Sequence, residues 1–148
     1  MIRSLATVIG GLAILSATAV NADPGATISV KSSTSTHTRW NGHGDLIREV
    51  PLCILSDTGG FVLQVTSQSA SESAAGQIEF LLEDPSGSTS AAKGAPGTIA
   101  ILDGVVDPAA DCRGGSNARL RVTFPREQLL AGVAGDLALD LQFSVRPR

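Results

Sequence analysis

Residues 137–146 carry the clearest pattern of apolar and polar positions in the chain, a strict alternation. Because successive side chains of a β-strand point to opposite faces, this alternation predicts a strand with one face in a hydrophobic core. Shorter alternations predict strands of the same kind at 61–66, 77–82 and 118–124. In the last strand, the residues expected in the core are Leu137, Leu139, Leu141, Phe143 and Val145.

Further strands are predicted at 26–31, 47–55 and 98–102, which brings the expected number to about seven. Turn segments rich in Gly, Asp and Ser, such as 56–60, separate the strands, because these residues favour or tolerate the backbone angles of turns. The predicted helical content is one short segment at 125–130 that begins with proline. We therefore predict an all-β fold, an antiparallel β-sandwich of immunoglobulin-like type.

The first 22 residues are typical of an export signal. Arg3 supplies a positive start, residues 5–19 are apolar, and Val20 and Ala22 place small residues three and one positions before a cleavage point. An uncleaved anchor helix is the alternative, but the apolar run is shorter than the ~20 residues that a bilayer span requires. We expect cleavage before Asp23 and a secreted or periplasmic mature chain without a membrane span.

The expected mature chain divides by composition into two parts. Residues 23–45 hold the first predicted strand and a connection rich in Ser, Thr and Gly, and residues 46–148 hold the predicted β-sandwich domain. The connection contains both histidines and the single tryptophan, at His37, Trp40 and His43. Metal ligation or stacking of a sugar ring on the indole is one interpretation of this segment, and a polar loop around a buried tryptophan is the favoured one.

Cys53 and Cys112 are the two cysteines of the chain. In the oxidising compartment that export implies, their simplest use is one intramolecular disulfide. The closed loop of roughly 60 residues would stabilise the fold by about 4 kcal/mol in the chain-entropy model. A redox pair normally lies close together in the sequence and a zinc site needs four ligands, so neither alternative fits this pair well.

The composition argues against catalysis and against nucleic-acid binding. The formal net charge is −3 and charged residues make up 17% of the chain, so no basic surface is expected for a phosphate backbone. Two histidines, two cysteines and no tyrosine leave few candidates for a nucleophile or a general base. We expect a protein that is not an enzyme and that uses no cofactor and no metal.

Three stretches of the chain combine glycine with strand-like residues, and two of them also contain a cysteine. They are 52–67, which reads LCILSDTGGFVLQVTS, 112–122, which reads CRGGSNARLRV, and 134–139, which reads AGDLAL. Together they resemble the spore coat protein U family, whose members are secreted, fimbrial-subunit-like proteins of Gram-negative bacteria associated with chaperone–usher systems. The resemblance implies a fimbrial-subunit-like sandwich whose partners are a periplasmic chaperone and an outer-membrane usher.

The last predicted strand extends this resemblance. Subunits of that superfamily have a glycine fourteenth from the C-terminus and apolar residues fourth, sixth and eighth from it. Here these positions are occupied by Gly135, Val145, Phe143 and Leu141. Pro147 stands where the family has a penultimate aromatic residue, and proline also removes a donor from the strand ladder. The resemblance implies that such a subunit is assembled through this strand.

The sandwich of such subunits lacks its last strand, so a groove of core residues lies beside unpaired backbone groups and must be covered. A chaperone strand fills the groove first, and the N-terminal extension of the next subunit fills it afterwards. The matching segment here is 26–31, in which Ala26, Ile28 and Val30 share one face. An ordinary first strand of the same chain is an equally good interpretation of this segment.

The resulting expectation is a secreted or periplasmic protein, placed finally at the cell surface. It would serve as a structural or adhesive subunit of a fimbria-like assembly built by β-strand donation and self-polymerisation. The alternative is a self-complete secreted β-sandwich module that binds carbohydrate or protein at the Trp40 segment. The two differ in one property, because a subunit polymerises or binds a chaperone whereas a complete module is a stable monomer.

Overall fold

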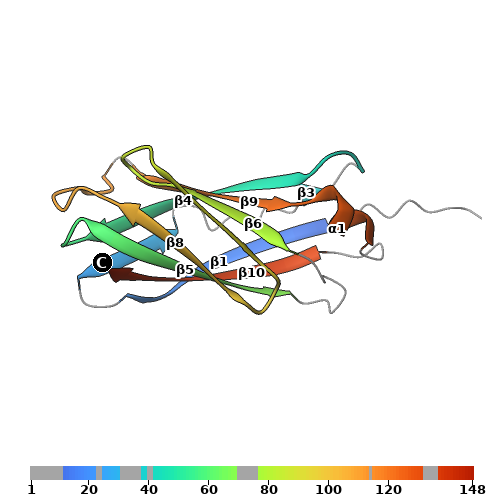
Figure 1. Cartoon of the computed structure of the whole chain (residues 1–148), viewed down its shortest axis with the longest axis horizontal. Helices are drawn as coiled ribbons and strands as arrows, with labels where there is room; N and C mark the ends of the chain where they lie inside the picture. The colour runs from blue at the N-terminus through green and yellow to red at the C-terminus, as the bar shows by residue number, and fades with distance from the viewer. Residues whose placement is uncertain are drawn as a thin grey trace, which may run out of the picture.

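The computed structural model describes residues 12–22, 25–30, 38–39, 42–69, 77–113, 115–131 and 137–148. Within these ranges the chain forms strands β1 to β10 and one short helix, α1, arranged as two five-stranded sheets packed face to face (Figure 1). The all-β sandwich is confirmed, with strands β1 to β10 in place of the expected seven or so. The described ranges contain no helix that is long and apolar enough to span a membrane.

The two sheets combine strands from distant parts of the sequence. Sheet A has the order β3-β1-β10-β5-β8, and sheet B has the order β2-β4-β9-β6-β7. The strands that the sequence did not predict are β1, β3 and β7, and the predicted helical segment is α1. The bounds are β1 Leu12–Ala22, β2 Ala26–Val30, β3 Thr38–Arg39, β4 Leu46–Ser56, β5 Gly60–Ser69, β6 Ile78–Glu83, β7 Thr89–Gly94, β8 Ile99–Val105, β9 Ala118–Phe124, α1 Arg126–Ala131 and β10 Leu137–Pro147.

The strand order is that of an immunoglobulin-like sandwich. In such domains strands A, B, E and D form one antiparallel sheet, and strands C, F and G form the other. Here β2, β4, β9 and β6 stand in the A, B, E and D positions, and β5 and β10 stand in the C and F positions. The G position, next to F, is occupied by β1, which runs parallel to β10 instead of antiparallel.

The core lies between the sheets and is built from the alternate residues of each strand. In β8 and β9 every second residue is buried along the whole strand. The largest fully buried side chains include Phe61, Phe80 and Phe143. Burying a side chain of this size contributes about 1.5–3 kcal/mol relative to leaving it exposed. Gly104 in β8 makes room for one of these rings, since a Cβ at this position would overlap the ring of Phe61.

Asp84 ties the turn between β6 and β7 to β8 in the other sheet. It is 6% exposed, and its carboxylate accepts hydrogen bonds from the N–H groups of Ser86 at 2.9 Å, Ser88 at 3.0 Å and Val105 at 2.9 Å. Burial alone would raise the pKa of this carboxyl. The hydrogen bonds from the Ser86 hydroxyl and from the three backbone N–H groups outweigh burial and hold the pKa below its usual value.

Asp84→Asn is expected to lower the free energy of unfolding at pH 7 by about 2 kcal/mol, because hydrogen bonds to a buried charged acceptor are weakened or left unmade. In the wild type this contribution is present above the unfolded-state pKa of about 3.9 and is lost as the pH falls through the lower folded-state pKa. The variant should therefore lose less stability on acidification. Urea unfolding at pH 7 and pH 3 measures both effects, with Asp103→Asn, at an exposed position of β8, as the control. Equal acid sensitivity of Asp84→Asn and the wild type would contradict this role of the carboxylate.

Candidate functional site

β10 is paired along both of its edges (Figure 1). On one side β5 pairs antiparallel with residues 139–147 of β10. On the other side β1 pairs parallel with residues 137–145. We call the strand position that β1 (Leu12–Ala22) occupies beside β10 the β10 site.

The occupant of the β10 site is the segment that the sequence predicts to be removed on export. Cleavage before Asp23 would take away all of β1 and leave the strands from β2 onward. The backbone N–H and C=O groups on that side of β10 would lose their partners, and an exposed row of such groups pairs readily with another strand. The structure thus identifies the side of β10 at which a strand must be replaced if the predicted cleavage occurs.

The residue types of β1 explain why a leader-like segment fits this position. Its sequence, LAILSATAVNA, is made of apolar, β-branched and small polar residues and carries no charge. The parallel register places Ala17 opposite Leu141 and Ala19 opposite Phe143. At these two positions a small residue of β1 is therefore in register with a large residue of β10.

β10 buries the face that the alternation predicts. Leu141, Phe143 and Val145 are 0, 1 and 2% exposed, whereas Arg146 on the other face is exposed. The strand is therefore confirmed, and so is its buried face at these three residues, whereas the side chains of Leu137 and Leu139 lie outside the described ones. The role of Leu141, Phe143 and Val145 in assembly stays a prediction. Gly135, the fourth residue predicted for assembly, lies outside the described residues.

β2 pairs with β4 of the same chain. The two strands run antiparallel, with Ala26 opposite Ser56 and Ile28 opposite Ile54. Ala26 is buried, and Ile28 packs against the core cluster. β2 is thus a strand of its own sandwich in this structure, and donation of Ala26, Ile28 and Val30 to a neighbouring subunit stays a prediction.

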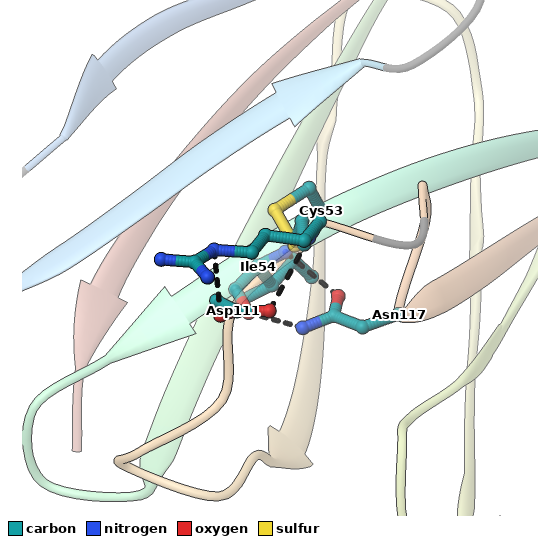
Figure 2. Close-up of a disulfide and its surroundings, with 6 residues drawn as sticks. Cys53, Ile54, Asp111 and Asn117 are labelled. Carbon is teal, nitrogen blue, oxygen red and sulfur yellow. Dashed lines mark hydrogen bonds and ion pairs between the residues drawn. A yellow bond between two sulfur atoms is a disulfide. The ribbon is translucent and has the colours of Figure 1, made fainter.

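The predicted disulfide between Cys53 and Cys112 is confirmed (Figure 2). The two Cα atoms lie 6.0 Å apart, across a sequence separation of 59 residues. Cys53 belongs to β4 and is buried, but it lies outside the core cluster that contains its neighbours Leu52 and Ile54. The bridge therefore fastens the connection between β8 and β9 to the outer side of sheet B and does not cross the core between the sheets.

Asn117 strengthens this attachment, and the sequence analysis did not single it out. Its side-chain oxygen accepts a hydrogen bond from the Ile54 N–H at 2.9 Å, and its side-chain nitrogen donates to the Ile54 carbonyl at 2.6 Å (Figure 2). Its own backbone N–H donates to the Leu52 carbonyl at 2.9 Å. The side-chain amide of Asn117 thus pairs with both backbone groups of Ile54, as a residue of a neighbouring strand would, just before β9 begins. The available signal was the stretch CRGGSNA, in which this asparagine follows the second cysteine.

The Trp40 segment lies largely outside the described residues. His37 and Trp40 are among the residues that the structure does not describe, and His43 is exposed. In the described ranges, no three His, Cys, Asp or Glu side chains are grouped so that they could hold a metal ion. A carbohydrate or protein site at this segment stays an untested prediction.

No protein-family model matches the chain, and no curated protein matches it at a significant level. A solved structure of a chaperone–tip adhesin complex, described as vital for synergistic activation of CFA/I fimbriae biogenesis, is similar to it with a TM-score of 0.42 and 11% sequence identity. The similarity covers 84% of this chain and 43% of that one, so the chain spans less than half the length of the protein it matches. A likeness this weak does not define a family, and the resemblance to the spore coat protein U family still rests on the sequence stretches alone.

Proposed function

We propose that the protein is a secreted structural or adhesive subunit of a fimbria-like surface assembly, in which a strand from outside the chain fills the β10 site. The observation that carries this proposal is that the G position of the sandwich is held by Leu12–Ala22, the segment predicted to be cut off on export. A mature chain without β1 has an open edge beside a hydrophobic core, and β-strand addition is the general way to cover such an edge. The proposal includes no catalysis and no cofactor.

A periplasmic chaperone, an outer-membrane usher and further copies of the chain are the partners that the family resemblance suggests for such a subunit. An added strand would supply hydrogen bonds to the backbone of β10 and alternate side chains to the core. The disulfide supports a location outside the cytoplasm, because such bonds persist in oxidising compartments. The proposed location is therefore the periplasm followed by the cell surface.

A self-complete binding module is the alternative, and one observation favours it. In the described structure the G position, like the other strand positions of both sheets, is filled by this chain's own residues. If Leu12–Ala22 were kept, the sandwich would be closed without a partner and its loops would be free to bind carbohydrate or protein. The fate of the first 22 residues decides between the two functions.

Export of the full-length chain from a Gram-negative host tests the proposal. We expect mass spectrometry to show a product that begins at Asp23, and size-exclusion chromatography to show it as oligomers or bound to a chaperone. A synthetic peptide with the β1 sequence should convert this product to a monomer and raise its melting temperature, because a ligand that binds the folded state stabilises it. A processed chain that is a stable monomer on its own and does not bind the peptide would favour the self-complete module.

Two variants of that peptide provide a matched control. Ala19 is in register with the fully buried Phe143, and Thr18 is in register with Gln142, which is half-buried on the other face. Ala19→Asp should abolish the stabilisation, because a carboxylate would be placed beside the core without a partner. Thr18→Asp should retain most of it. Equal loss with both peptides would show that the peptide does not bind in the β10 site.

A further inference from the structure

Arg48 in β4 is a charged residue at an inward position. It lies on the face of β4 that carries the buried residues Leu46 and Val50, and its neighbour across the ladder is the buried Val122 of β9. The Nε and Nη2 atoms of its guanidinium are buried and have no hydrogen-bond partner among the described residues, although the residue as a whole is half-buried. An arginine side chain carries a positive charge, and buried atoms of a charged group that lack a partner are destabilising. Buried polar groups in native proteins almost always have a partner, so the missing acceptor at Arg48 requires an explanation.

The acidic residues close to Arg48 in the sequence are engaged elsewhere. Glu49, at the next and outward position of β4, pairs with Arg121 at 3.2 Å. The carboxylate of Asp45 accepts a hydrogen bond from the N–H of Arg126 at 2.8 Å. Neither carboxylate supplies the missing acceptor.

The sandwich places Arg48 on the same side as the β10 site. β2 covers β4 only at residues 52–56, so within the described ranges β4 has no strand neighbour at Arg48 on the side away from β9. This side of sheet B lies over the β1 side of sheet A, since both β1 and β10 contact β2. Pro147 lies near Gly25, whose carbonyl accepts a hydrogen bond from the N–H of Asp57 at 2.8 Å. β10 and β4 therefore end at the same end of the sandwich.

Counting residues back from the end that β4 and β10 share shows how far along the sandwich Arg48 lies. Arg48 precedes the end of β4 at Ser56 by eight residues, or about 26 Å at about 3.3 Å per residue. The same count back from Pro147, the end of β10, reaches Leu139, and the partner of Leu139 in β1 is Leu15. Arg48 and the part of the β10 site around Leu15 therefore lie at about the same distance from this end of the sandwich.

We propose that Arg48 makes the β10 site selective for a strand that carries a carboxylate. β1 has no acidic residue, so the strand present in the structure cannot neutralise the guanidinium. The inferred occupant is an extended segment of another protein, with apolar residues at alternate positions and one Asp or Glu near Leu139. A second copy of this chain fits less well, because its candidate donor segment 26–31 contains Lys31, and the nearest acid, Asp23, stands three residues before that segment. This inference rests on the proposed function, which supplies the incoming strand.

A double-mutant cycle in the intact, oxidised chain tests this inference, with residue 15 of β1 standing in for the acid of the partner. The variants Leu15→Glu and Leu15→Gln introduce side chains of similar size that differ in charge. With Arg48 present, we expect the Glu variant to have an unfolding equilibrium constant about tenfold smaller than the Gln variant, through pairing with the guanidinium. In the Arg48→Met background this preference should disappear or reverse, because the carboxylate then has no counter-charge. Urea unfolding followed by circular dichroism measures the four constants.

Substitutions at neighbouring positions keep the test decisive. Ala13 and Ala17 flank Leu15 on the same face by register, so Glu and Gln at these positions serve if the Leu15 variants do not fold. Ile14, at the alternate position, is the matched control, and its Glu-to-Gln difference should not depend on Arg48. The absence of an Arg48-dependent preference for Glu at residues 13, 15 and 17 alike would overturn the inference and show that water solvates the guanidinium. That outcome would leave the proposed function standing, because cleavage and peptide binding test it separately.

Discussion

Phe143→Asp is expected to abolish folding of the protein. Phe143 is 1% exposed and belongs to the core cluster between the sheets. The substitution would bury an unpaired carboxylate and also remove a large aromatic ring, and each change costs about 3 kcal/mol or more. Their sum is comparable with the whole stability of a typical domain, which is about 5–15 kcal/mol. The measurement is the yield of soluble chain, together with near-UV circular dichroism of any chain that is recovered.

Gln142→Asp is the matched control for this substitution. Gln142 neighbours Phe143 in β10 but is half-buried on the other face of the strand. A carboxylate at this position keeps contact with water, so we expect a change in the free energy of unfolding of about 0.5 kcal/mol or less. If the two variants behaved alike, the assignment of the buried face of β10 would be wrong.

Cys53→Ser is expected to lower the free energy of unfolding by about 2–5 kcal/mol, the usual effect of removing a native disulfide from a small domain. The bridge closes a separation of 59 residues and holds the connection between β8 and β9 against β4. Without it, the unfolded chain gains conformations that the cross-link forbids, and the folded connection loses its covalent link to β4 while keeping the hydrogen bonds of Asn117. Urea unfolding of the variant and of the reduced wild type should give similar midpoints, both below that of the oxidised wild type.

The native exported protein should also contain no free thiol. Labelling with a thiol reagent in denaturant, before and after reduction, measures this directly, and Cys112→Ser serves as the partner variant. Full labelling without reduction would contradict the disulfide, and equal stability of Cys53→Ser and the wild type would contradict its contribution to the fold.

The strands that bury one face were predictable because their pattern is local. In β9 and β10 the buried residues recur at every second position, and a half-buried strand needs that alternation whatever its neighbours are. The disulfide was predictable for a related reason, since two cysteines have one way to pair within a chain. Short-range chemistry was sufficient in both cases.

β7 shows where the local pattern is insufficient. Its sequence, TSAAKG, has no large apolar residue and predicts no strand. It is a strand because it pairs along β6, where Lys93 lies opposite Glu79 and forms an ion pair of 2.7 Å with it. The hydrogen bonds to β6 stabilise β7 as a strand, although the residues of β7 have little preference for strand structure.

The sequence by itself determined the sandwich class, the buried face of β10 and the disulfide, and only the tertiary structure decided what lies beside β10. An uncharged apolar run such as Leu12–Ala22 fits a signal segment and a buried strand equally well, so its pairing with β10 could not be read from its residues. The roles of Arg48 and Asn117 depend on the tertiary structure in the same way. The buried guanidinium atoms of Arg48 find no acceptor in the part of the chain that is described, and the side chain of Asn117 accepts a hydrogen bond from the backbone of Ile54. The physical reason is that neighbours along a sheet edge and counter-charges beside a core are contacts between residues far apart in sequence, and no local periodicity encodes them.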